Sequence, residues 1–181
     1  MAQPEFLFKV VLAGDSRVGK TSLRKRYLGE GFEQGYIHTL GAEFASKIVS
    51  SNGNSVEFQI WDLAGEHTFN SVRMKYYMGA DAVIFMFAIN DSNSFYNIYN
   101  WLVEYFNNTE SKKNALFFLI GNKLDLNHER QVQKSDVTFQ IKSYETEFKV
   151  QFQYFETSAL SGQNVEDVFT TIMTKKLEEN S

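Results

Sequence analysis

Residues 14–22, GDSRVGKTS, have the residue types and the spacing of a loop that binds phosphate groups. Gly14, Gly19, Lys20 and Thr21 fit the pattern G-x-x-x-x-G-K-[ST], in which backbone N–H groups surround the phosphates of a nucleotide. The lysine supplies a positive charge to the β- and γ-phosphates, and the threonine hydroxyl can bind Mg²⁺. We therefore expect the whole loop to bind nucleotide: Gly14, Asp15, Ser16, Arg17, Val18, Gly19, Lys20, Thr21 and Ser22.

Arg17 occupies a variable position of this pattern, between the two glycines. One interpretation is a solvated side chain at the outer edge of the loop. The other is an arginine that stabilises charge on the phosphates during bond cleavage. The residue type alone leaves both interpretations open.

Residues 61–65, WDLAG, contain a second pair of candidate residues. Asp62 follows the run VEFQI, so we expect its carboxylate at a strand end, where it can hold Mg²⁺ through water. Gly65 leaves its N–H free for a γ-phosphate. The pattern D-x-x-G alone also fits a plain turn, so its significance depends on the phosphate loop.

Residues 121–125, GNKLD, indicate which base the nucleotide carries. Asp125 offers two acceptor oxygens that suit the N1–H and the exocyclic amine of guanine, a donor pair that adenine does not present on that edge. Lys123 can lie against the ring and Asn122 can tie this loop to the phosphate loop. The alternative is a strand-end turn in which Asn and Asp make local bonds.

A last segment, ETSAL, provides further donors for the base. We expect its backbone N–H groups to meet the guanine O6, and they belong to Ser158, Ala159 and Leu160. This segment carries little information without the preceding ones.

The elements that must position these residues alternate along the chain. Apolar runs at 6–14, 80–90, 115–122 and 150–159 predict strands, and the NGN between two runs within 45–65 predicts a hairpin. Helices are predicted after the phosphate loop and over 94–108, 131–148 and 164–179, the last with Asn164 as its cap. The pattern predicts a doubly wound α/β fold: a mostly parallel six-stranded sheet with one antiparallel edge strand and helices on both faces. Such sheets bind ligands at the carboxyl ends of their strands.

Composition restricts the class of protein. The 181 residues predict a single domain over 1–181, and no run of 18 apolar residues is present. The net charge is −4 with scattered basic residues, so we expect no nucleic-acid partner. The absence of cysteine excludes disulfides, thiolate metal sites and Cys-linked lipids in this sequence, and the start lacks a secretory signal, so we expect a cytoplasmic protein.

In order and spacing, the motifs resemble the Ras superfamily of small GTPases over nearly the whole chain, and within it the Rab family. The similar segments are GDSRVGKTSL, TLGAEF, WDLAGEHTF, YYMGADAVIFMF, DSNSFYNIYNW, GNKLDL and ETSALSGQNVEDVF. The resemblance implies a small G domain of the P-loop NTPase class and a GTP/GDP-binding molecular switch that needs Mg²⁺. It also implies GTP hydrolysis and a role in vesicle trafficking, at the cytosolic face of an endomembrane.

The resemblance also assigns roles by position. Thr39 would bind Mg²⁺ with Thr21 and Asp62 and sense the γ-phosphate, and Phe32 would pack against guanine. The catalytic residues would be Lys20, Thr39, Gly65 and Glu66. We expect a monomer whose partners are an exchange factor, a GTPase-activating protein and effectors that read Phe44, Trp61 and Tyr76. A core role is the alternative for each of these aromatic residues.

The chain departs from the family at several positions. Glu66 stands where a glutamine usually orients the attacking water, so we expect slow hydrolysis or, as an alternative, a nucleotide-locked binding module. Leu160 replaces a common lysine, and its apolar stem can still cover the base. No cysteine pair follows the last helix, so we expect the family's flexible tail to lie beyond Ser181, and peripheral membrane attachment only with a lipidated tail. A metabolic P-loop kinase or ATPase, the other alternative, would not need Asn122, Lys123 and Asp125.

Overall fold

The computed structural model describes residues 4–30, 39, 41–51, 53–65, 70–109 and 115–180. The elements in chain order are β1 (Phe6–Gly14), α1 (Lys20–Leu28), β2 (Ala42–Ser51), β3 (Asn54–Leu63), α2 (Asn70–Tyr77), β4 (Ala82–Ala88), α3 (Ser92–Tyr96), α4 (Ile98–Asn108), β5 (Leu116–Asn122), the 3-10 helix η2 (Leu124–Glu129), α5 (Lys134–Phe148), β6 (Phe152–Glu156) and α6 (Val165–Glu179).

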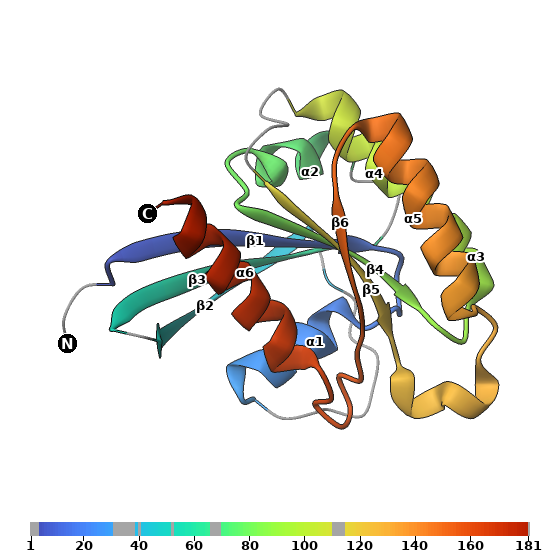
Figure 1. The fold of residues 1–181 in the computed structure, drawn as a ribbon, viewed down its shortest axis with the longest axis horizontal. Coiled ribbons are helices and arrows are strands. Elements are labelled where there is room, and N and C mark those ends of the chain that lie inside the picture. The colour runs from blue at the N-terminus through green and yellow to red at the C-terminus, as the bar shows by residue number, and fades with distance from the viewer. Residues whose placement is uncertain are drawn as a thin grey trace.

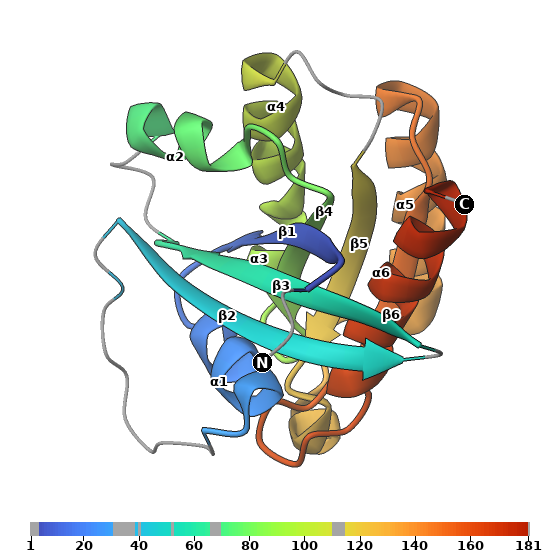
Figure 2. The ribbon, with the colours of Figure 1, turned by 90° about the vertical axis from the view of Figure 1, so that its left-hand side faces the viewer.

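The six strands form one sheet in the order β2-β3-β1-β4-β5-β6. The pairs β1–β3, β1–β4, β4–β5 and β5–β6 are parallel, while the edge strand β2 runs antiparallel to β3. Figure 2 views the sheet from the β2 edge. This topology confirms the predicted doubly wound α/β fold, and it brings the carboxyl ends of β1, β3, β5 and β6 to one edge of the sheet.

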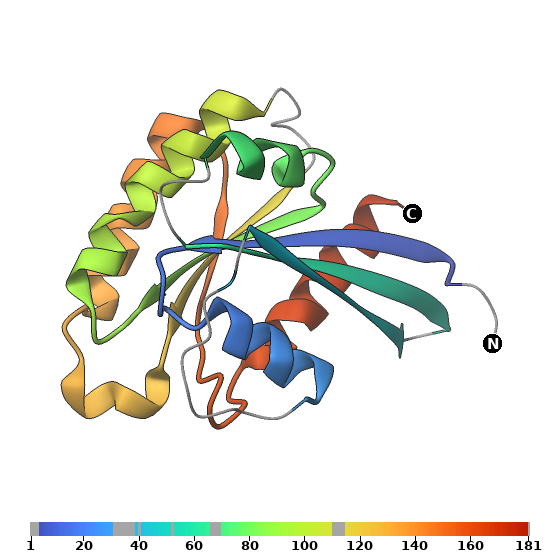
Figure 3. The same cartoon turned by 180° about the vertical axis from the view of Figure 1, so that it is seen from behind.

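Helices cover both faces of the sheet and enclose two apolar cores. The helices α1 and α6 pack on one face (Figure 1). In the core beneath them, Tyr27 stacks on Phe169 at 3.5 Å between ring centroids. The helices α2, α3, α4 and α5 lie on the opposite face (Figure 3). Trp101 and Tyr144 belong to the core on that side. The central strand β4 is buried along its whole length, as its continuous apolar sequence predicts.

The β2–β3 hairpin is confirmed by its register. Ser51 pairs with Asn54, so a two-residue connection joins the strands, and Gly53 in this connection has a φ of 86°. Glycine accepts positive φ without a steric penalty, which is why an Asn-Gly pair favours this tight turn.

Three local features differ from the sequence-based expectations. The helix expected over 94–108 divides at Asn97 into α3 and α4. The helices α2 and η2 were not predicted, because the hydrophobic periodicity of their polar sequences is too weak. Asn164 is the N-cap residue of α6, as predicted, but its side chain does not bond the helix. It has a φ of 58° and makes no side-chain cap bond, because its Nδ2 donates to the Glu156 carbonyl at 2.7 Å.

Candidate nucleotide-binding site

The phosphate loop connects the end of β1 to the start of α1 and surrounds the Lys20 side chain. Lys20 Nζ donates to the carbonyl oxygens of Gly14 at 2.6 Å and Asp15 at 2.8 Å, and the residue is only 6% exposed. Burial lowers the pKa of Lys20 to about 8, against the opposing effect of the carboxylates of Asp62 and Asp15. A buried ammonium group that is bonded to uncharged carbonyl oxygens is well suited to a phosphate.

Packing requires glycine at three positions of the site, and at Gly14 and Gly19 a positive φ also favours it. A Cβ at Gly14 would lie 2.2 Å from the Met86 carbonyl oxygen of β4, and a Cβ at Gly19 would lie 2.2 Å from Asn122 Nδ2. A Cβ at Gly65 would lie 2.3 Å from the Ser16 backbone nitrogen. The sequence pattern explains these glycines by contact with phosphate, and the structure adds the close approach of β4, Asn122 and the phosphate loop to one another.

Arg17 adopts a φ of 67°, in the left-handed region that a non-glycine residue enters at a cost in free energy. Its side chain is exposed, while the neighbouring Val18 is buried with 1% of its surface accessible. Ser22 lies within the first turn of α1 and is partly buried. The loop therefore directs Arg17 outward, in line with its interpretation as a residue of the outer edge.

Three oxygen-bearing side chains gather where a metal ion was predicted. Thr21 Oγ1 donates to Asp62 Oδ2 at 2.5 Å and lies 3.2 Å from Thr39 Oγ1. Asp62 is fully buried, and its Oδ1 has no hydrogen-bond partner among the described residues. Burial raises the pKa of Asp62, while the Thr21 hydrogen bond and the charge of Lys20 lower it.

This arrangement fits a magnesium ion. A hard divalent cation prefers hydroxyl and carboxylate oxygens and retains water ligands. A buried carboxylate oxygen without a partner is costly, and a hydrated cation would satisfy it. Thr21, Thr39 and Asp62 thus have the donor chemistry of the predicted site.

Asn122 joins the base-selecting segment to the phosphate loop. Its Nδ2 donates to the Val18 carbonyl at 2.8 Å, and its Oδ1 accepts from Thr157 Oγ1 at 3.1 Å and from the Ala159 N–H at 3.2 Å. The residue is 1% exposed. One buried amide therefore connects three loops that are far apart in sequence.

The loop after β6 is arranged differently from the expectation. Ser158 Oγ donates to Asp125 Oδ1 at 2.5 Å, while the Ser158 N–H donates to the Gln163 carbonyl at 3.1 Å. In this structure the Ser158 N–H thus closes its own loop, and its hydroxyl holds the Asp125 carboxylate. Leu160 is 46% exposed beside this segment, and Lys123, with a φ of 67°, is partly buried.

Sequence reasoning missed two arginines that support this loop. Arg26 of α1 donates through Nε to the Ala159 carbonyl at 2.8 Å and through Nη2 to the Leu160 carbonyl. Arg130 makes a bidentate ion pair at 2.7 and 2.9 Å with Glu156, the first residue of the ETSAL segment. The partners in these pairs are distant in sequence, so no local pattern could have identified them.

The three aromatic residues form one continuous group. The ring centroids of Phe44 and Trp61 are 5.0 Å apart, and those of Trp61 and Tyr76 are 5.2 Å apart. Phe44 is 50% exposed, which excludes the core interpretation for this residue, while Trp61 and Tyr76 are partly buried. Phe32 and Glu66, the other predicted site residues, lie outside the described residues.

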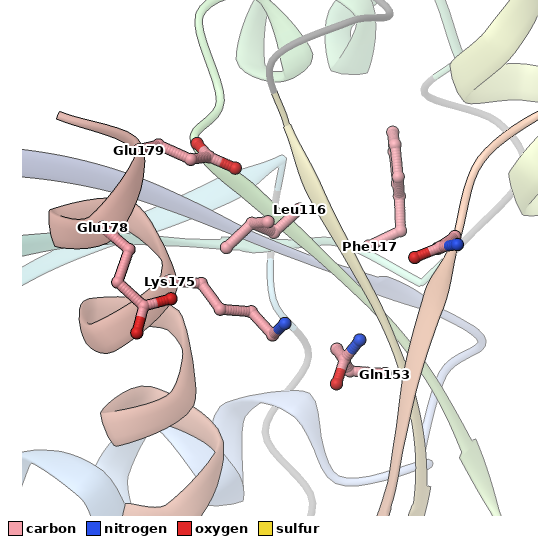
Figure 4. A pocket seen from close by; sticks show the side chains of 7 residues that line it. Leu116, Phe117, Gln153, Lys175, Glu178 and Glu179 are labelled. Atoms are coloured by element: carbon pink, nitrogen blue, oxygen red, sulfur yellow. The ribbon is translucent and has the colours of Figure 1, made fainter. Parts of the chain in front are cut away.

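A separate pocket of about 370 Å³ lies at the opposite end of the strands (Figure 4). Its labelled lining residues are Leu116, Phe117, Gln153, Lys175, Glu178 and Glu179. None of the predicted nucleotide residues lines this pocket. Among the helices in the described part of the chain, none is long and apolar enough to cross a membrane.

Comparisons with known proteins agree with this geometry. The family model described as Ras family matches residues 9–178. The chain is similar to the Ras-related protein Rab-9A of Homo sapiens, with 38% identity over 171 residues that cover 93% of this chain and 82% of that protein. It is also similar to the Ras-related protein Rab-13 of Bos taurus, with 38% identity over 168 residues that cover 93% of this chain and 79% of that protein. The Ras-related protein SEC4 of Candida albicans (strain WO-1) is 33% identical over 180 residues, which cover 97% of this chain and 82% of that protein.

Proposed function

This chain belongs to the Ras family and is a Rab-like small GTPase of the Ras superfamily, and on that premise we propose that it is a Mg²⁺-dependent GTP/GDP switch in vesicle trafficking with slow GTP hydrolysis. The observation that carries the proposal is the position of Asn122. Its amide bonds Val18 of the phosphate loop and Ala159 of the last motif. The loops that would bind the base and the phosphates are therefore fixed relative to each other by this one residue.

Base selection rests on Asp125, whose Oδ1 is fixed by the Ser158 hydroxyl. A fixed carboxylate presents its acceptors to the N1–H and amine of guanine without a further loss of side-chain entropy. Phe32 and Leu160 would cover the ring, and Lys123 would lie along it. These contacts favour guanine over adenine.

The phosphates would occupy the loop around Lys20. Its ammonium group is held by two carbonyl oxygens and can turn toward the β- and γ-phosphates. Thr21, Thr39 and Asp62 would hold Mg²⁺, which when bound offsets charge on the phosphate oxygens. Arg17 lies outside this group, and we assign it to the solvated rim of the loop.

The switch would depend on contacts that only the triphosphate can make. The Thr39 backbone and the Gly65 N–H would bond the γ-phosphate, and loss of that phosphate would release both loops. The exposed Phe44 and the adjoining Trp61 and Tyr76 would then present a different surface to effectors. An exchange factor and a GTPase-activating protein would act on the same loops.

Slow hydrolysis follows from the chemistry of Glu66. A glutamine amide accepts from the attacking water and also donates to the developing charge, whereas an ionised carboxylate only accepts. A carboxylate also repels the γ-phosphate unless a proton or a cation offsets it. We therefore assign Glu66 to a weakened version of the glutamine role.

Single-turnover cleavage of bound GTP tests this assignment. Wild type, Glu66→Gln and Glu66→Ala are compared between about pH 6 and about pH 8, with and without a GTPase-activating protein. With an activator, Glu66→Gln should differ from wild type by about tenfold or more, because one donor to the transition state is worth several kcal/mol. The wild type should slow relative to Glu66→Gln as the pH rises, because the carboxyl group then loses the proton that restores a donor.

The outcomes separate the alternatives. Three superimposable profiles with measurable turnover would contradict the role of Glu66. GTP that stays intact in wild type while Glu66→Gln cleaves it would identify the nucleotide-locked binding module. Localisation is tested separately by fractionation of cells, and attachment to the cytosolic face of an endomembrane would need a lipidated segment outside residues 1–181, since these contain no cysteine.

A further inference from the structure

Two side chains at the start of α4 hold the phosphate loop through Asp15. Asn97 Nδ2 donates to Asp15 Oδ1 at 2.5 Å, and Trp101 Nε1 donates to the same oxygen at 2.7 Å. Trp101 is 1% exposed, so its indole N–H depends on this partner. The sequence placed Asp15 in the phosphate loop, but the Asp15 carboxylate faces α4.

The next turn of α4 holds the segment that leads into Gly65. Glu104 accepts a bidentate pair of bonds from Arg73 of α2, at 2.8 Å to Nε and 2.7 Å to Nη2. Arg73 Nη1 donates to the Ala64 carbonyl at 3.4 Å, and its guanidinium lies 4.7 Å from the centre of the Trp101 ring. The Arg73 side chain is 0% exposed and that of Glu104 is 10% exposed.

These two attachments meet at the phosphate-binding site. Gly65 packs so closely on the phosphate loop that a Cβ would lie 2.3 Å from the Ser16 nitrogen and 2.5 Å from the Asp15 carbonyl carbon. Asn97, Trp101 and Glu104 follow one another at helical spacing, so they lie along one side of α4. One side of α4, with the residue that precedes it, is therefore connected both to the phosphate loop and to the segment that ends at Gly65.

A merely stabilising role does not account for this arrangement. A buried ion pair pays a desolvation cost that its attraction often only balances, so it is weak evidence for stability. Its value lies in geometry, because a bidentate guanidinium–carboxylate pair permits few orientations. The residues it orients are Ala64 and, through it, Gly65.

We propose that Asn97, Trp101 and Glu104 of the α4 side, with Arg73, form an internal clamp that fixes the distance between the phosphate loop and the Gly65 turn and so favours the triphosphate over the diphosphate. The clamp residues are positioning residues, since they act through Asp15 and Ala64. The inference rests on the proposed guanine-nucleotide binding and adds the means by which the third phosphate is recognised.

The test compares the release of two fluorescent nucleotides, a non-hydrolysable GTP analogue and GDP, in the presence of Mg²⁺. Arg73→Lys keeps the charge and removes the bidentate geometry, and Trp101→Phe removes the N–H to Asp15 while keeping a ring beneath Arg73. Each variant should speed release of the GTP analogue by about tenfold, with less than about threefold change for GDP, because the clamp sets the separation of the two loops and only the γ-phosphate would contact both. Tyr77→Phe is the control: it removes a 3.3 Å bond to Glu104, leaves Arg73 in place and should alter neither rate.

A double variant adds a second readout. If both attachments act on one distance, Arg73→Lys with Trp101→Phe should speed release of the GTP analogue by less than the product of the single effects. Equal acceleration of both nucleotides in folded single variants, or no acceleration of either, would overturn the clamp. Absence of guanine-nucleotide binding by the wild type would instead overturn the proposed function, and the clamp with it.

Discussion

At the scale of single residues, the side chains of this site have partners that their motifs do not reveal. Asn122 bonds the phosphate loop, as the sequence predicts, and it also bonds the last motif, which the sequence did not predict. Asp125, by contrast, is fixed by the Ser158 hydroxyl, while the Ser158 N–H is used within its own loop. The proposed recognition of the base would therefore depend on a carboxylate that the protein has already oriented.

Replacing that carboxylate should change which base is bound. In Asp125→Asn one acceptor becomes a donor that opposes the guanine amine, so GTP affinity should fall by about a hundredfold or more. Xanthosine triphosphate, which carries an acceptor at that position, should bind the variant better than GTP does. Competition against a fluorescent nucleotide measures both, with the exposed Asp167→Asn as the control, and unchanged GTP affinity in Asp125→Asn would contradict the assignment.

The residues that the motifs named could be predicted because their chemistry repeats at fixed spacing. Lys20, Thr21, Asp62 and Asn122 all lie at the predicted edge of the sheet. Arg26 could not be predicted, because the carbonyl it holds is 133 residues away and any donor could in principle reach it. Long-range pairs of this kind are set by the packed fold and leave no periodic signal.

At the scale of elements, the phosphate loop starts where two parallel strands are in close contact. Gly14 ends β1 with a φ of 141°, and an added Cβ would lie 2.2 Å from the Met86 carbonyl of β4. The strand pattern predicted β1 and β4, but it could not show that they touch at this glycine. The start of the loop is therefore fixed by sheet packing before any nucleotide is bound.

Gly14→Ala should destabilise the fold more than the same substitution at a glycine whose added Cβ would contact no other atom. The cost should exceed about 3 kcal/mol, because both the conformation and the β4 backbone oppose the added carbon. Gly29→Ala is the matched control: Gly29 also has a positive φ, 81°, but nothing lies within 4 Å of its added Cβ, so about 1 kcal/mol is expected. Urea unfolding measures the free energy of unfolding of both variants. Equal decreases would show that the β4 backbone moves aside at little cost, and would contradict the prediction.

The carboxylate of Glu156 holds the end of β6, and its ionisation should make the free energy of unfolding depend on pH. Burial alone raises the pKa of Glu156, but the hydrogen bonds from Arg130 and Tyr154 outweigh it and hold that pKa below the ordinary 4.5. The stabilisation is therefore fully present above 4.5 and is lost as the pH falls through the folded-state value.

Glu156→Gln tests this ionisation directly. The variant should lose about 2 kcal/mol of unfolding free energy at neutral pH, and the difference from wild type should shrink as the pH falls below the ordinary value of 4.5. Denaturant unfolding over that range measures the difference, with Glu178→Gln on the exposed side of α6 as the control. A difference independent of pH would show that the charge of Glu156 is not what holds the loop.

At the scale of the whole molecule, the sheet brings four separate segments to one edge while two apolar cores hold its faces. The alternation of apolar strands and helices was sufficient to predict this architecture, because buried parallel strands have a continuous apolar signature. The weakly periodic α2 escaped prediction, although its Arg73 connects the Gly65 turn to α4. The sequence could not predict that helices on one face of the sheet bond to the loops at its edge.

Equilibrium binding of fluorescent GDP, in competition with GTP, ADP and ATP and with Mg²⁺ or a chelator, measures whether these loops form a single Mg²⁺-dependent guanine-nucleotide site. Guanine nucleotides should bind at least about a thousandfold more tightly than adenine nucleotides, because Asp125 would otherwise face unmatched groups. Chelation should weaken GDP binding by about tenfold or more, because Thr21 and Asp62 would then lose the cation that they are proposed to hold. Equal affinity for guanine and adenine nucleotides, or GDP binding unaffected by the chelator, would show that no such site exists.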